Sequence, residues 1–127
     1  MNNTQHTLQA AGTVVSATGS LGELDMPAHK GVRYHVKVTA KSGTNPTLDL
    51  KAQTYDSGSG DWVDITGASL AQITNTISTK LLIYPGVAES ANLKVSDTPG
   101  RRVRLLATIG GTATPTFTLS LSAERLI

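Results

Sequence analysis

The chain has 127 residues, a formal net charge of +2, 39% hydrophobic and 16% charged residues, and no cysteine. This length suits one domain with a real core, and the hydrophobic content is too high for a disordered chain. The small charge argues against a dedicated nucleic-acid or membrane binder, and without cysteine there are no disulfides, thiolate metal sites or cysteine nucleophiles. The N-terminal MNNTQHTLQAAG lacks the basic and apolar regions of a secretory signal, so we expect synthesis in a cytoplasm.

The N-terminal segment, residues 1–9, is polar and has no strong periodicity. We expect an arm there that is either flexible or embraces a neighbouring subunit, with Asn2, Asn3 and Thr4 as candidate contact residues. Residues 10–127 are expected to form a single β-sandwich domain, whose first strand includes Thr13–Ala17.

The clearest strand of the first half is Val32–Ala40, where apolar residues alternate with polar ones. The turn-forming segment Ser42–Thr47 follows, and Leu48–Ala52 resumes the alternation, which predicts a hairpin. Three basic residues on the outer face form a positive stripe: Arg33, His35 and Lys37. Such residues usually solvate a strand and guard it against edge pairing, although an anion site is an alternative.

Four carboxylates lie in or near the acidic turn that follows the hairpin: Asp49, Asp56, Asp61 and Asp64. Several carboxylates near one turn suggest calcium, but the spacing of a dedicated calcium loop is missing. Asp and Ser before Gly also form turns without metal, so no metal site is predicted. The single tryptophan, Trp62, is expected to pack over the sheet edge or core.

The region after this turn is less regular. Gly67–Ile77 is expected to be a short helix or an irregular crossover, and Thr79–Tyr84 a buried strand. The loop that begins with Pro85, Gly86 and Val87 is a candidate contact surface. A short strand is expected at Asn92–Val95.

The C-terminal stretch Arg101–Ala123 predicts a second hairpin, with a turn at Gly110–Pro115. SGTNPTLDL in the first hairpin and GGTATPTFTL in the second share a Gly-Thr…Pro-Thr pattern. The repeat reflects either convergent turn chemistry or a pseudo-symmetric pair of hairpins in two facing sheets. The whole pattern predicts an all-β fold: an antiparallel β-sandwich, jelly-roll-like or Ig-like, with seven or eight strands and at most one short helix.

No catalytic motif stands out in the sequence. The three histidines (His6, His29 and His35) lie in a tail, a turn and a strand face, and no nucleophile elbow, phosphate-binding loop or metal-binding histidine motif is present. We therefore expect a protein that is not an enzyme and has no cofactor, metal or small-molecule substrate. Arg101, Arg102 and Arg104 form the basic concentration. Because aliphatic rather than aromatic residues interleave them, we favour a protein contact over a nucleic-acid contact, and plain solvated charge is the alternative to both.

Three segments carry a resemblance to a known family: VKVTAKSGTNPTLDLKAQ, the acidic turn with DWVDI, and RRVRLLATIGGTATPTFTLSLSA. They cover about half of the chain, which resembles the capsid decoration, or cement, proteins of tailed bacteriophages. The resemblance implies a homo-dimer or homo-trimer on the virion surface that bridges subunits of the major capsid protein. A phage tail or neck component and a carbohydrate-binding β-sandwich module are the alternatives.

Overall fold

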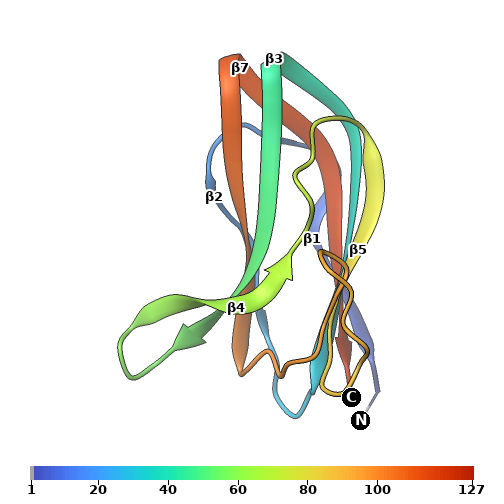
Figure 1. Ribbon diagram of the computed structural model, residues 1–127, viewed down its shortest axis with the longest axis vertical. Coiled ribbons are helices and arrows are strands. Elements are labelled where there is room, and N and C mark those ends of the chain that lie inside the picture. The colour runs from blue at the N-terminus through green and yellow to red at the C-terminus, as the bar shows by residue number, and fades with distance from the viewer. Residues whose placement is uncertain (1) are drawn as a thin grey trace.

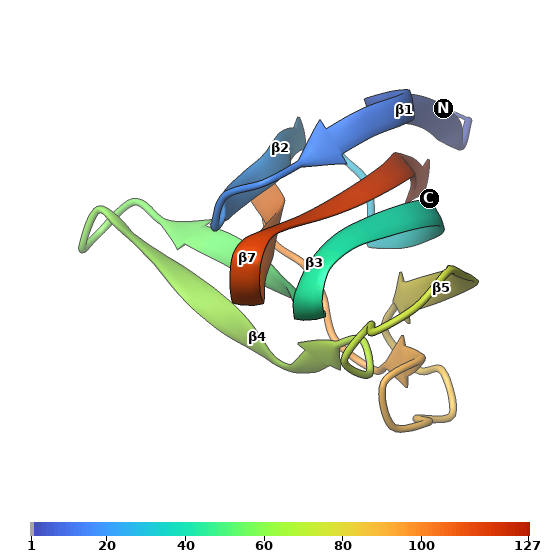
Figure 2. The same cartoon turned by 90° about the horizontal axis from the view of Figure 1, so that it is seen from above.

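The computed structural model describes residues 2–127, which form seven strands and no helix. The strands are β1 (Thr4–Val15), β2 (Gly19–Asp25), β3 (Gly31–Asp56), β4 (Asp61–Ser69), β5 (Ile77–Ile83), β6 (Lys94–Val95) and β7 (Arg102–Leu126). They pair in the order β1-β7-β3-β5-β6, with β2 also on β7 and β4 also on β3. The sheet folds over into two facing layers (Figures 1 and 2), which confirms the all-β, sandwich-like prediction.

Two long strands, β3 and β7, form a ribbon that runs through both layers. They are antiparallel along their whole length, from Gly31 opposite Leu126 to Thr54 opposite Val103. The prediction of two separate hairpins is therefore wrong, because each segment is one bent strand whose partner is the other segment. Figure 1 shows both strands turning over together at one end of the molecule. This arrangement buries the apolar faces of both halves against each other.

The bend explains the repeated Gly-Thr…Pro-Thr pattern. Gly43 and Gly111 have φ angles of 100° and 116°. A Cβ atom on Gly43 would lie 2.7 Å from Pro115 Cα, and one on Gly111 would lie 3.0 Å from Pro46 Cα. Each glycine thus lies against the proline of the opposite strand. The two segments are related by a pseudo-symmetric bend, and only glycine fits where the backbones approach so closely.

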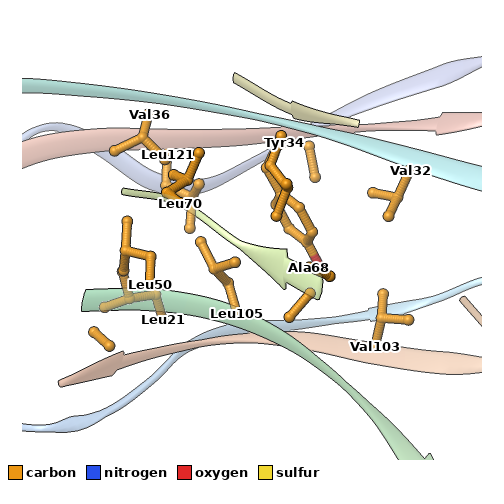
Figure 3. Close-up of a cluster of buried hydrophobic side chains, with 14 of the residues drawn as sticks. Leu21, Val32, Tyr34, Val36, Leu50, Ala68, Leu70, Val103, Leu105 and Leu121 are labelled. Atoms are coloured by element: carbon orange, nitrogen blue, oxygen red, sulfur yellow. The ribbon is translucent and has the colours of Figure 1, made fainter. Parts of the chain in front are cut away.

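The core fills the space between the layers. In Figure 3, Val36 and Leu121 come from one layer and face Leu50 and Leu105 of the other. All four side chains are at most 1% exposed, and each fully buried leucine contributes about 1.5–3 kcal/mol relative to exposure. Tyr34 crosses the interior, and burial raises the pKa of its hydroxyl, which has no hydrogen-bond partner among residues 2–127.

The remaining segments are attached to this ribbon. β1 pairs with the end of β7, starting with Thr4 opposite Arg125, so residues 4–9 of the predicted arm belong to a paired strand of the chain itself. Met1 lies outside the described residues. Between β4 and β5 the chain forms an irregular crossover instead of a short helix, and the backbone of Ile73 bonds both ways to Leu48 at 2.9 Å. Residues 2–127 include no helix that could cross a membrane.

Candidate protein-interaction surface

Arg101 precedes β7 and is held beside the end of β2. Its Nε and Nη2 atoms donate to the two carboxylate oxygens of Asp25, at 2.7 and 3.3 Å. These hydrogen bonds lower the pKa of Asp25 and raise that of Arg101. The side chains of Arg101 and Asp25 are 71% and 56% exposed, so the ion pair has a defined geometry and is accessible to a partner protein.

Arg102 and Arg104 lie on one outer face of β7, as predicted, where they stack on aromatic rings. The guanidinium carbon of Arg102 lies 4.4 Å from the centroid of the Tyr55 ring, and that of Arg104 lies 4.5 Å from Trp62. The two rings meet edge to face at 5.3 Å. Arg102 also pairs with Glu23 at 2.9 Å. Cation–π contacts of this kind contribute about 0.5–1 kcal/mol each at partly exposed sites.

Gln53 connects this stacked cluster to β4. It is only 7% exposed, accepts a hydrogen bond from Arg104 Nε at 2.8 Å and donates one to Asp64 at 2.8 Å. Hydrogen bonds from Gln53 and Lys51 lower the pKa of Asp64. Arg104 therefore satisfies a buried amide oxygen, and it also helps to hold together the layer in which β7, β3 and β4 pair.

The N-terminal contact candidates lie beside the C-terminus. The side chain of Asn3 accepts a hydrogen bond from the Ile127 amide at 2.9 Å, and the Thr4 hydroxyl accepts one from Arg125 Nε at 2.9 Å. Arg125 in turn donates to the backbone oxygen of Asp25. Asn2 is exposed.

The loop after β5 also lies beside the C-terminus. The hydroxyl of Tyr84 donates to the carbonyl of Ile127 at 2.8 Å, which ties the start of the loop to the C-terminus. Pro85 and Gly86 are exposed and Val87 is half-buried. The Gly86 amide donates to the Ser96 hydroxyl at 2.9 Å, so the loop has a defined shape.

These contacts bring three predicted contact elements to one end of the molecule. Asn3 and Tyr84 share Ile127, while Thr4 and Arg101 are connected through Arg125 and Asp25. We call this region the terminal end; it consists of Asn2–Thr4, Pro85–Val87 and Arg101. Figure 1 shows both chain termini there, at the end opposite the bend. Arg102 and Arg104 lie on the adjacent outer face.

Three carboxylates in or near the acidic turn accept hydrogen bonds from the chain itself. Asp56 accepts hydrogen bonds from the Gly58 amide and the Ser59 hydroxyl, and the latter is the main cause of its lowered pKa. Asp49 accepts from Gln72, and Asp64 from Gln53. Across residues 2–127, no three histidine, aspartate or glutamate side chains gather where they could hold a metal ion.

Sequence reasoning missed the partners of the arginines. Tyr55 and Trp62 reach Arg102 and Arg104 because β3 lies between β7 and β4 and places the four side chains on one face. The alternation of Lys51, Gln53 and Tyr55 with core residues is visible in the sequence. The pairing of β3 with β7 cannot be read from the sequence in the same way, because each segment also has the pattern of a hairpin that pairs with itself.

No protein-family model and no curated protein sequence matches the chain. Among solved structures, the chain is similar to the protein in the crystal structure of the infectious bursal disease virus VP2 subviral particle, with a TM-score of 0.43 and 13% sequence identity. The match covers 98% of this chain and 30% of that chain. At this level the similarity establishes neither a family nor a function.

Proposed function

We propose that this protein is a structural virion protein of a tailed bacteriophage. It binds the outer surface of the capsid and bridges subunits of the major capsid protein. The supporting observation is the terminal end, where three contact elements predicted from separate parts of the sequence lie together. Binding through this end is non-catalytic and needs no cofactor.

The terminal end is suited to docking because its parts are already ordered. Asn3, Thr4 and Gly86 are each held by a hydrogen bond to another segment, so little conformational entropy is lost on binding. Arg101 presents a largely exposed guanidinium, whose planar donors suit a carboxylate of a partner. Many copies on a repeating lattice would combine modest individual contacts into strong overall binding to the capsid.

The proposal includes a homo-dimer or homo-trimer and a location on the virion surface after synthesis in the host cytoplasm. Light scattering coupled to size-exclusion chromatography measures the oligomer directly. The carbohydrate-binding alternative is less well supported, because the guanidinium groups of Arg102 and Arg104 each cover one face of an aromatic ring that a sugar would need. A tail or neck component would form rings or tubes rather than occupy capsid lattice positions.

The test is sedimentation of the purified protein with isolated capsids of the phage whose genome encodes it. Arg101→Glu reverses one exposed charge at the terminal end, and we expect it to weaken binding about tenfold, since charge reversal replaces attraction by repulsion. Lys41→Glu makes the same kind of change near the bend, where Lys41 bonds the Thr74 carbonyl. It should bind like the wild type. Equal binding of Arg101→Glu and wild type would reject the terminal end as the docking site.

A further inference from the structure

The outer face of the layer formed by β1, β5, β6 and the adjacent halves of β3 and β7 carries an excess of positive charge. Arg33, His35 and Lys37 alternate along β3, Lys80 stands opposite His35 on β5, and Lys94 lies beside Leu82 on β6. We call these five residues the basic face. The layer has one acidic residue, Glu124, and it pairs with Arg33 at 2.9 Å. Among residues 2–127, no carboxylate forms an ion pair with Lys37, Lys80 or Lys94.

The basic face lies beside an open sheet edge. β5 pairs with β3 through its whole length, but β6 pairs only with Leu82 and Ile83. The amides of Leu82 and Tyr84 donate to Leu93 and Val95 on that side. Because backbone groups alternate along an antiparallel strand, those of Ser78 and Lys80 point toward the same edge, where no strand among residues 2–127 pairs with them.

A groove runs along this part of the protein and combines charge with apolar surface. Its volume is about 450 Å³, and its lining includes Arg33, Ser78, Lys80, Leu82, Leu93 and Lys94. Leu93 is 47% exposed, and Ile77 at the start of β5 is 46% exposed. The groove therefore offers basic side chains, exposed leucine and unpaired backbone groups together.

We propose that this groove binds an extended acidic segment of a partner protein, which adds as a strand to the edge of β5. Backbone hydrogen bonds to Ser78 and Lys80 would supply the pairing, while alternate side chains of the segment face Lys80 and Lys94. An apolar side chain of the segment would pack on Leu82 and Leu93. This inference goes beyond the proposed function, because the terminal end contributes none of these groups.

Charge complementarity selects an acidic protein segment as the occupant. A second copy of the chain is a poor fit, since the nine acidic residues are scattered and form no acidic run. Nucleic acid is less well matched, because the groove lining has no aromatic ring on which a base could stack. A protein segment also uses the open backbone edge, which a nucleic acid cannot pair with as a strand.

The test measures fluorescence anisotropy with a labelled peptide of about ten residues in which glutamate and valine alternate, the pattern of a strand with one acidic face. We expect saturable binding to the full chain, and a loss of about tenfold in affinity in the variant Lys80→Glu/Lys94→Glu. The double variant Lys30→Glu/Lys41→Glu makes a matched charge change at two exposed positions outside the groove and should bind like the wild type. Circular dichroism checks that each variant is folded. Lys80→Ala is the second variant, with a smaller loss expected in the same direction.

Strand addition has its own signature. The same peptide with every backbone nitrogen methylated keeps its charges but cannot donate the backbone hydrogen bonds of a strand from either edge, and we expect it not to bind. Hydrogen exchange at the amides of Ser78 and Lys80 should slow when the unmethylated peptide is added. The proposal is overturned if the methylated peptide binds equally well, if no peptide binds, or if single-stranded DNA of the same length binds more tightly and loses affinity in the same variant.

Discussion

Because β3 and β7 approach closely at their bend, we expect one added methyl group at Gly43 to lower the stability of the fold strongly. In Gly43→Ala the new Cβ would lie 2.7 Å from Pro115 Cα and 3.0 Å from the Thr112 carbonyl oxygen, both backbone atoms that cannot rotate away. The residue also has a φ of 100°, which costs a non-glycine residue about 1–2 kcal/mol. Overpacking adds about 1–3 kcal/mol. We therefore expect the free energy of unfolding to fall by about 2–5 kcal/mol.

Two control variants separate these contributions. Gly12 has a φ of 88°, but a Cβ atom added there would meet nothing within 4 Å, so Gly12→Ala should incur only the backbone cost. Gly19 has open space and no positive φ, so Gly19→Ala should be close to neutral. Thermal unfolding measures all three, and for a chain of this size each kcal/mol shifts Tm by about 3–5 °C. A Gly43→Ala loss no larger than that of Gly12→Ala would refute the close approach of the two strands.

Further predictions concern the stacked cluster and the core. Arg104→Ala should lower the free energy of unfolding by about 1–3 kcal/mol, because it leaves the buried oxygen of Gln53 without its donor. Arg102→Ala should lower it by less than about 1 kcal/mol. Chemical denaturation compares the two variants, and equal losses would contradict the role of Gln53. Tyr34→Phe removes a buried hydroxyl without a partner, so Tm should stay the same or rise, and a clear fall would show that the hydroxyl is bonded. The lowered pKa of Asp64 means that its stabilising contribution is present above the ordinary value of 3.8 and is lost as the pH falls through the lowered value. Asp64→Asn should flatten the decline of Tm in acid below about pH 4, and an unchanged decline would contradict this.

The sequence predicted the fold class because alternation is a local signal. The alternating pattern places Val103, Leu105 and Ala107 on one face, and all three are fully buried. Strand pairing could not be predicted in the same way, because Gly110–Pro115 has the residues of a hairpin turn and also those of a bend in a continuous strand. The difference depends on contact with Gly43 and Pro46, more than sixty residues away in the chain.

The candidate site was predictable in part for the same reason. The shared face of Arg102 and Arg104 follows from their spacing, but their stacking on Tyr55 and Trp62 depends on the register between β3, β4 and β7. The first residues of β1 carry no strand signal in the sequence, because Thr4–Thr7 is entirely polar. Their pairing follows from the position of β7 and not from any apolar pattern of their own.

The measurement that tests the proposed function most directly is cryo-electron microscopy of capsids from the phage that encodes this chain. We expect copies of the two-layered fold on the outside of the shell, at repeated lattice positions. Their terminal end should face the major capsid protein, and the bend of β3 and β7 should point outward. Density for the protein only in the tail or neck, or on the capsid with the bend facing the shell, would contradict the proposal.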